Sequence, residues 1–294
     1  MDGKMRKVKV AATQMAVSWN IDENIVRAES LVRKAKEQGA NIVLLQELFE
    51  TPYFCQKEIA EYYNLATEIS ENKAVKHFSK LAAELELVIP VSFYERKNNA
   101  KYNSVAMIDA DGKVLGVYRK THIPDGPGYE EKFYFNPGDT GFKVWNTRYG
   151  RIGVGICWDQ WFPETARSMA LMGAEMLLYP TAIGSEPEEA CIDSMRHWQI
   201  CMQGHAAANI MPVIASNRVG IEKMEDSSIT FYGSSFISGF TGEIIKSCSR
   251  DREEVIVEEF DLDEIWAYRD AWGVFRDRRP QIYKTIMTSD GEGY

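Results

Sequence analysis

The sequence predicts a layered α/β fold, in which helices cover the outer faces of β-sheets. Strand-like and helix-like stretches alternate along all 294 residues, and strand pairs joined by short turns interrupt the alternation. Such pairs favour a layered sandwich over a purely parallel, doubly wound sheet. Neither a repeat nor a Pro- or Ser-rich linker divides the chain, so we expect one domain over residues 1–294.

The chain begins with the pattern of a strand, a helix and a second strand. Residues 8–14 have the composition of a strand. Residues 22–38 place apolar side chains at helical spacing, and Gly39 follows as a stop signal. The short apolar run at residues 42–45 is typical of a strand that is covered on both faces.

A second helix and a strand meander follow. Residues 71–86 again repeat apolar side chains at helical spacing. Three strands come next, joined by turns at Asn-Asn and Asp-Gly pairs. Residues 121–141 form a long irregular loop rich in proline and glycine, and such loops are commonly functional. The three strands span residues 87–95, 101–109 and 113–120.

The second half of the chain repeats this alternation. Helices are expected at residues 163–172 and 194–208. Because helices separate strands in both halves, we expect them on the outer faces of the sheets. The strands of this half are expected at residues 151–156, 175–179, 212–216, 235–238, 244–247 and 254–260.

Composition and charge argue against several classes of protein. Asp and Glu (43) outnumber Lys and Arg (34), which gives a formal net charge of −9, so we expect no nucleic-acid partner. No apolar run approaches the roughly 18 residues of a membrane span, and the first residues do not read as a signal peptide. Five irregularly spaced cysteines are typical of a reducing compartment, so we expect a cytoplasmic protein.

Three reactive side chains stand at the ends of predicted strands. Glu47 and Cys157 each follow an apolar strand closely, and Lys120 ends another. Ligands of α/β sheets bind at the carboxyl ends of strands. A carboxylate, an ammonium and a thiol can therefore converge at one edge of the fold.

Cys157 is the candidate nucleophile. Its strand contains Gly153 and Gly155, which let other backbone approach closely. A turn between a strand and a helix exposes a nucleophile beside backbone N–H groups. The thiol needs a base and a nearby cation, which Glu47 and Lys120 can supply. From spacing alone, a buried and inert cysteine fits equally well.

Other residues offer alternative chemistries. His122 lies beside Lys120 and can serve as the base of a Cys-His enzyme. His197, Cys201 and His205 recur every four residues and can in principle bind zinc, although core packing is the favoured interpretation. The phosphate-binding and dinucleotide-binding glycine motifs are absent, so no nucleotide cofactor is expected.

Three separated motifs resemble the nitrilase superfamily of carbon–nitrogen hydrolases. They are QELFETPYF at 46–54, YRKTHIPDGPGYEEKFYFNPGDTGF at 118–142 and GICWDQWFPE at 155–164. The resemblance extends from VAATQM at 10–15 to DLDEI at 261–265. It implies a four-layer αββα sandwich with pseudo-symmetric halves, assembled as a homo-oligomer (a dimer or larger).

The resemblance also assigns roles to residues. Glu47 matches the general base of the superfamily, Lys120 the lysine that stabilises an oxyanion, and Cys157 the nucleophile. Glu131 matches a second glutamate that positions the lysine and the substrate, with Glu130 as a neighbouring alternative. These roles imply hydrolysis of a non-peptide carbon–nitrogen bond, with no metal and no organic cofactor.

Within the superfamily, CWDQWFPE, YPTAIGSEP, RHWQICMQGHAAAN and PVIASNR are similar to the branch that hydrolyses N-carbamoylputrescine in polyamine biosynthesis. The expected partner is therefore a small cationic ureido compound. Its ammonium group calls for a negative, partly aromatic pocket, with Glu186 and Asp125 as the favoured ammonium partners. The expected substrate-binding residues are Tyr53, Asp125, Trp158, Trp161 and Glu186, with Tyr129 and Glu130 as further candidate walls.

Several alternatives remain at this stage. A β-ureidopropionase-like enzyme, an ω-amidase or an aliphatic amidase would share the same three reactive residues. An anionic substrate would call for an arginine clamp from Arg196 or Arg218. A non-catalytic binding protein would lack at least one of the three residues, and all three are present. The C-terminal tail from about residue 266 carries aromatic side chains that cover either another subunit or the core of the same chain: Trp266, Tyr268, Trp272 and Phe275.

Overall fold

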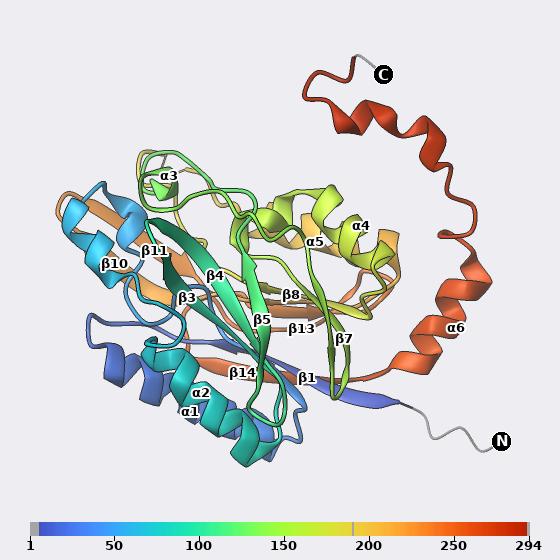
Figure 1. The fold of residues 1–294 in the computed structure, drawn as a ribbon, viewed down its shortest axis with the longest axis horizontal. Helices are drawn as coiled ribbons and strands as arrows, with labels where there is room; N and C mark the ends of the chain where they lie inside the picture. The colour runs from blue at the N-terminus through green and yellow to red at the C-terminus, as the bar shows by residue number, and fades with distance from the viewer. Residues whose placement is uncertain (1–5, 190, 293–294) are drawn as a thin grey trace.

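The computed structural model describes residues 6–189 and 191–292. Its first half begins with the predicted strand–helix–strand unit and the meander (Figure 1). Both helices begin at asparagine caps: the Asn20 side chain accepts from the Glu23 N–H, and the Asn72 side chain accepts from the Val75 N–H. The elements are β1 (Lys7–Gln14), α1 (Ile21–Glu37), β2 (Ile42–Leu44), α2 (Lys73–Leu85), β3 (Ile89–Lys97), β4 (Ala100–Ile108) and β5 (Val114–Arg119).

The second half contains the predicted helices and strands and several further elements. The loop at 121–141 includes the short helix α3 (Glu131–Tyr134). The remaining elements are β6 (Val144–Thr147), β7 (Gly150–Val154), α4 (Pro163–Leu171), β8 (Met176–Pro180), α5 (Met195–Asn209), β9 (Val213–Ser216), β10 (Val219–Met224), β11 (Ser227–Tyr232), β12 (Phe236–Ser238), β13 (Ile244–Ser247), β14 (Glu254–Asp261) and α6 (Leu262–Trp272).

Apart from the two-stranded β10–β11 sheet, the described strands form two β-layers. The first joins two three-stranded sheets, ordered β14-β1-β2 and β3-β4-β5, through a parallel bridge between Ile42 and Val88. The second is one sheet ordered β13-β12-β9-β8-β7-β6. Both layers have parallel strands at the centre and antiparallel strands at the edges.

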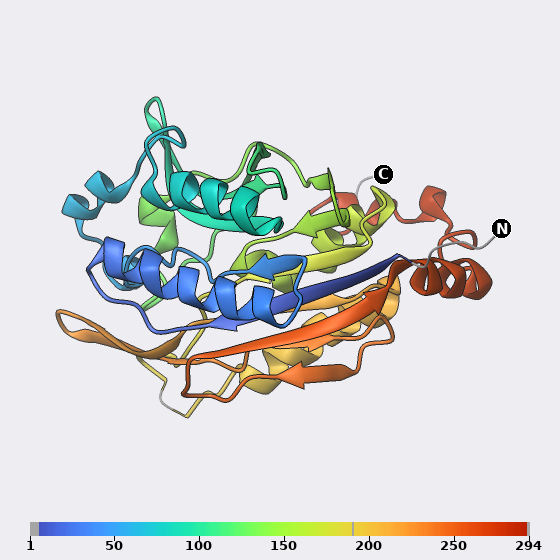
Figure 2. The ribbon, with the colours of Figure 1, turned by 90° about the horizontal axis from the view of Figure 1, so that it is seen from below.

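Three apolar interfaces hold four layers together. Helices α1 and α2, which lie side by side in Figures 1 and 2, cover the first β-layer with side chains such as Phe78. Helices α4 and α5 cover the second β-layer with Met169 and Trp198. The two β-layers pack against each other between them. Alternation along β8 serves both interfaces, because Leu177 packs toward the helices and Leu178 toward the other β-layer. The αββα order is therefore confirmed.

The two halves repeat one unit. The succession β1-α1-β2-α2-β3 has its counterpart in β7-α4-β8-α5-β9, and β1–β2, β7–β8 and β8–β9 pair in parallel. The repeat matters for the site because Glu47 follows β2, Lys120 follows β5 and Cys157 follows β7. Strands from both halves thus deliver reactive side chains to one place.

The predictions missed β6, the β10–β11 hairpin and α6. Strand β6 reads Val-Trp-Asn-Thr, a pair of apolar residues followed by a pair of polar ones, and so shows no alternation. Helix α6 starts directly after β14, and its N-cap Asp261 accepts from the backbone N–H groups of Asp263 and Glu264. None of the helices in the described ranges is long and apolar enough to span a membrane.

Candidate active site

A buried cluster of one lysine and two glutamates lies between the β-layers and the loop at 121–141. Lys120 Nζ donates to Glu47 Oε1 at 2.9 Å and to Glu131 Oε2 at 2.7 Å. All three side chains are almost completely shielded from solvent. Buried charges are tolerated only when they are paired and hydrogen-bonded, and these satisfy that condition.

The cluster keeps its lysine charged. Burial alone would lower the pKa of Lys120, but Glu131 and Glu47 raise it well above its usual value. Burial raises the pKa of Glu131, and the Lys120 ammonium opposes that shift. A fixed cation therefore lies beside two carboxylates in a water-poor site.

Neighbouring side chains fix the carboxylate oxygens. The Tyr53 hydroxyl donates to Glu131 Oε1 at 2.7 Å. Asn103 Nδ2 donates to Glu47 Oε1 at 2.6 Å. The second oxygen of Glu47, Oε2, is buried and has no hydrogen-bond partner among the described residues. One oxygen of Glu47 is thus held while the other is available to accept a proton.

Cys157 lies in a tight turn at the end of β7. Its φ of 42° falls in the left-handed region, which a side-chain-bearing residue rarely adopts. Asp159 holds the turn, because its Oδ2 accepts from the Ile156 N–H at 2.9 Å and from the Tyr118 hydroxyl at 2.7 Å. A Cβ on Gly155 would come within 2.7 Å of the Tyr179 ring, so the strand can approach its neighbour here only with glycine.

The thiol is protonated at rest. Burial raises the pKa of Cys157 well above its usual value, Glu47 adds to the shift and Lys120 opposes it. A neighbouring base that accepts the proton, or a lowered pKa, turns such a thiol into a nucleophile. The Cys157 Sγ lies 3.7 Å from the Ala182 carbonyl oxygen, at the wall of a cavity.

That cavity of about 370 Å³ contains Cys157 and Glu131 in its wall. Among its described lining residues there is no Arg or Lys, whereas carboxylates come from Asp125, Glu131 and Glu186. The aromatic walls are Tyr129, Trp158 and Trp161, and the other lining residues are Pro124, Gly126, Pro127, Ala182, Ile183, Ser194 and His197.

The two proposed ammonium partners differ in their surroundings. Asp125 is about half exposed and lies 3.8 Å from the Lys132 ammonium. Glu186 is partly buried, and burial, with a smaller contribution from Glu189, raises the pKa of its carboxyl. Tyr53 and Glu130 do not line the cavity; Tyr53 lies behind Glu131, to which its hydroxyl donates.

The residues of the alternative chemistries lie in other contacts. His122 Nδ1 is 2.7 Å from Asp159 Oδ1, and its ring stacks on Phe162. His205 Nε2 contacts the Gln160 carbonyl oxygen, while His197 packs against Trp161 in the cavity wall. No group of three or more His, Cys, Asp or Glu side chains in the described ranges could hold a metal ion.

Neither candidate arginine clamp reaches the cavity. Arg218 is completely buried, and its guanidinium donates to Glu222 Oε1 at 2.8 Å and to the Glu47 carbonyl at 2.7 Å. It also donates to the carbonyl of Leu48, whose φ of 47° lies in the left-handed region. Arg196 is exposed and is not among the lining residues. Arg218 therefore holds the turn that carries Glu47.

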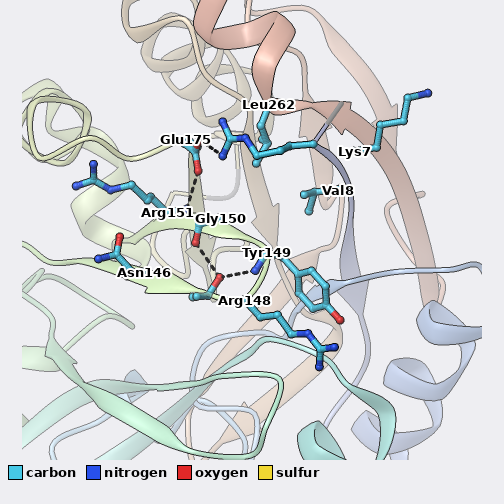
Figure 3. A pocket seen from close by; sticks show the side chains of 11 residues that line it. Lys7, Val8, Asn146, Arg148, Tyr149, Gly150, Arg151, Glu175 and Leu262 are labelled. Carbon is cyan, nitrogen blue, oxygen red and sulfur yellow. Dashed lines mark hydrogen bonds and ion pairs between the residues drawn. The ribbon is translucent and has the colours of Figure 1, made fainter. Parts of the chain in front are cut away.

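A second cavity, of about 420 Å³, lies where β1, the β6–β7 turn and α6 meet (Figure 3). Glu175 in its wall accepts from the Arg151 N–H at 2.8 Å. It also accepts from Trp266 Nε1 at 2.6 Å. Arg6 bridges Glu175 and Asp263. These contacts connect β1, β7 and α6, and none of the three reactive side chains lines this cavity.

Sequence reasoning missed two buried polar residues of the site, Asn103 and Asp159. Asn103 reaches Glu47 only because β4 and β5 pair in one particular register, which the sequence does not display. Asp159 did leave a signal, since a carboxylate in the apolar CWDQW segment needs buried partners.

Comparisons with known proteins agree with this geometry. A profile of the carbon-nitrogen hydrolase family matches residues 9–270. The chain is 60% identical to N-carbamoylputrescine amidase of Oryza sativa subsp. japonica, over 99% of this chain and 98% of that protein. It is 53% identical to a citrullinase of Francisella tularensis subsp. tularensis, over 96% and 99% of the two chains. The crystal structure of a carbon-nitrogen hydrolase from Helicobacter pylori G27 superposes with a TM-score of 0.90, at 39% identity over 96% and 99% of the two chains. The chain belongs to the carbon-nitrogen hydrolase family.

Proposed function

We propose that this enzyme hydrolyses N-carbamoylputrescine to putrescine, ammonia and carbon dioxide. One observation carries the proposal: a thiol beside a buried Glu–Lys–Glu cluster opens into a cavity lined by carboxylates and indoles, with no lining cation from Arg or Lys. Such a cavity accepts a ureido group at its inner end and an ammonium group toward its mouth. The 60% identity with a plant enzyme of that name supports the same substrate.

The first half-reaction forms a covalent intermediate. Glu47 accepts the thiol proton at Oε2, and Cys157 Sγ attacks the carbamoyl carbon. Two of the three Lys120 protons are directed at Glu47 and Glu131, so the third is available for the developing oxyanion, together with a backbone N–H near Trp158. Collapse of the tetrahedral adduct breaks the bond to the terminal nitrogen, and Glu47 returns the proton to the departing ammonia.

The second half-reaction releases the enzyme. Glu47 takes a proton from water, which attacks the thioester-type carbamoyl carbon and forms a second oxyanion beside Lys120. Breakage of the C–S bond returns the proton to Sγ and frees a carbamate. The carbamate then decomposes to putrescine and carbon dioxide, so the sum consumes one water and yields one ammonia.

The far end of the substrate is proposed to lie against Glu186. This carboxylate is partly buried in the cavity wall, whereas the charge of Asp125 is shared with Lys132. Trp158 and Trp161 offer apolar faces to the four-carbon chain. We expect Glu186→Ala to raise KM more than Asp125→Ala does; equal KM values in both variants and the wild type would contradict the cation pocket.

Citrulline is the second candidate substrate, favoured by the 53% identity with a citrullinase. Citrulline carries a carboxylate beside its ammonium group, and the described cavity lining offers it no Arg or Lys. We therefore expect N-carbamoylputrescine to be preferred. The same argument disfavours β-ureidopropionase, ω-amidase and aliphatic amidase activities. Their substrates are anionic or lack the ammonium group that the carboxylates of the cavity would bind.

The test is ammonia release from a panel of substrates. The panel contains N-carbamoylputrescine, citrulline, N-carbamoyl-β-alanine, glutamine, α-ketoglutaramate and a simple nitrile, with Cys157→Ala as the control. We expect the highest kcat/KM for N-carbamoylputrescine and none in the variant. A preference for another compound would overturn the substrate, and turnover by a folded Cys157→Ala variant would overturn the mechanism.

We further propose that the protein is a cytoplasmic homo-oligomer that uses its C-terminal tail between subunits. Trp266 and Phe275 contact their own chain, through Glu175 and through the cluster around α4 and α5. Trp272 and Tyr268 are exposed and stack on each other. The described cysteines are all free, which supports a reducing compartment.

A further inference from the structure

Asn103 contacts both Glu47 and Lys120. It lies on β4, completely buried, next to the residue pair Ser104–Arg119 of the β4–β5 ladder. Its carbonyl accepts from the Lys120 N–H at 2.8 Å, and its Nδ2 donates to Glu47 Oε1 at 2.6 Å. One residue thus ties the strand that carries the lysine to the side chain of the base.

The two oxygens of Glu47 have different surroundings. Oε1 accepts from Asn103 Nδ2 and from Lys120 Nζ, at 2.6 and 2.9 Å. Oε2 has no partner in the described part of the chain. A base that must accept, return and again accept a proton needs one oxygen fixed and the other unoccupied. The pair of donors on Oε1 provides that asymmetry.

We propose that Asn103 is a positioning residue that fixes the Glu47 carboxylate and directs its free oxygen to the thiol. The inference rests on the proposed role of Glu47 as the base. The amide suits this task because it is neutral: it stabilises the carboxylate and fixes its rotation without adding a second cation to the site. Lys120 donates to Oε1 from the end of a long side chain, whereas the shorter asparagine side chain holds its donor close to the β4 backbone.

The first test compares Asn103→Ala with Asn209→Ala. Asn209 at the end of α5 is a matched control, since its Nδ2 donates to one carbonyl, that of His205, and its Oδ1 has no partner, as in Asn103. We expect N103A to lose about 10- to 100-fold in kcat with KM within about 2-fold of the wild type, and N209A to retain both. The acid limb of the kcat profile moves to higher pH in N103A, because the ionised base has lost a donor.

A second variant and a second readout complete the test. Asn103→Asp keeps the side-chain shape but places an acceptor against Glu47, so it is expected to lose at least as much kcat as N103A. Alkylation of Cys157 by iodoacetamide, followed by peptide mass spectrometry, reports the ionisation of the neighbouring base without any substrate. Its acidic inflection moves to higher pH in N103A and stays in place in N209A.

These readouts separate the two proposals. A wild type that is inactive on the whole panel contradicts the proposed function, yet its alkylation profile still tests Asn103. Unchanged kcat and an unmoved acid limb in folded N103A or N103D would overturn the positioning role. Equal losses in N103A and N209A, with no shift of either pH profile, would reduce Asn103 to a structural residue and overturn it as well.

Discussion

At the scale of the residue, the site depends on one ammonium group that pairs with two carboxylates. Lys120 can serve two carboxylates because both contact it within 2.9 Å in a place that water hardly reaches. Burial raises the pKa of the Cys157 thiol, and Glu47 lies close enough to raise it further, while Lys120 opposes both. The thiol therefore rests in its protonated form, and the proposed mechanism assigns Glu47 to accept its proton.

Glu47→Gln separates the two effects of this carboxylate. We expect hydrolysis to fall by about 10²- to 10⁴-fold, because the variant loses the proposed general base. We also expect the pKa of Cys157 to fall, since the negative charge that disfavours the thiolate is removed while Lys120 stays. The thiolate fraction at a given pH rises, so iodoacetamide should alkylate Cys157 faster. Peptide mass spectrometry identifies the alkylated cysteine; slower alkylation in the variant, or retained turnover, would contradict this account.

The residue scale also shows where sequence reasoning ends. Glu47, Lys120 and Cys157 each stand at a strand end, and apolar neighbours make the carboxylate of Glu47 conspicuous. Position alone leaves Lys120 beside Arg119 as an ordinary strand end and Cys157 as an inert cysteine, so their proposed roles come from the resemblance to the superfamily. Asn103 is a polar residue in a strand that is buried on both faces from Tyr102 onward, and nothing local marks it as a partner of Glu47. The contact arises from strand pairing between distant segments, and pairing register is a property of the folded sheet.

At the scale of the element, the loop at 121–141 is fixed where it returns to β5. The Gly138 N–H donates to the Lys120 carbonyl at 2.8 Å, and a Cβ at Gly138 would overlap the Arg119 carbonyl oxygen. The loop also brings Glu131 to Lys120 through the one-turn helix α3. Close backbone approach at one glycine thus decides where a site carboxylate lies.

Gly138→Ala should therefore damage both stability and catalysis. We expect a loss of about 1–3 kcal/mol in the free energy of unfolding, because backbone must move to admit the methyl group, and a lower kcat because Lys120 moves with it. Gly204→Ala is the control: it lies in α5, its Cβ would meet nothing within 4 Å, and alanine favours the helix by about 0.5–1 kcal/mol. Urea unfolding and kcat measure both; a G138A enzyme equal to the wild type would contradict the argument.

The elements themselves were largely readable from periodicity. The helix predicted at 22–38 is observed at 21–37, and the helix predicted at 163–172 is observed at 163–171. The boundaries agree within one residue because an asparagine cap marks the start of the first helix and a first-turn proline marks the start of the second. The β10–β11 hairpin was missed although its buried and exposed residues partly alternate and Glu225 turns with a φ of 48°. That turn carries no glycine, so the sequence around it lacks the usual hairpin signal.

At the scale of the whole molecule, the layer order follows from which face each strand turns to its neighbours. The sequence alone predicts helices outside sheets, and the resemblance to the superfamily supplied the four-layer order that the packing clusters confirm. The paired halves explain why one site draws its residues from both: Glu47 and Lys120 come from the first half and Cys157 from the second. The surface that the C-terminal tail covers could not be predicted from the sequence in this way, because it depends on contacts beyond a single chain.

The C-terminal tail supplies the prediction that belongs to this scale. After α6 the chain runs along the outside of the molecule, away from both β-layers (Figure 1). Ile282, Ile286 and Met287 are each more than 60% exposed there, an arrangement that is unfavourable unless another surface covers them. A second copy of the chain offers a cover of the same composition, since symmetric homo-oligomers bury self-complementary patches.

Replacing these three residues by serine should weaken assembly. Size-exclusion chromatography with light scattering is expected to give an oligomer for the wild type and a lower mass for the triple variant at the same concentration. The control is Val26→Ser with Ile221→Ser, two side chains on the body of the fold that are each 64% exposed. These lie outside the tail, so their loss should leave the mass unchanged. A monomeric wild type would contradict a role of the tail between subunits. A triple variant of wild-type mass would contradict it as well, because apolar side chains that contact another subunit cannot be replaced by serine without loss of buried apolar area.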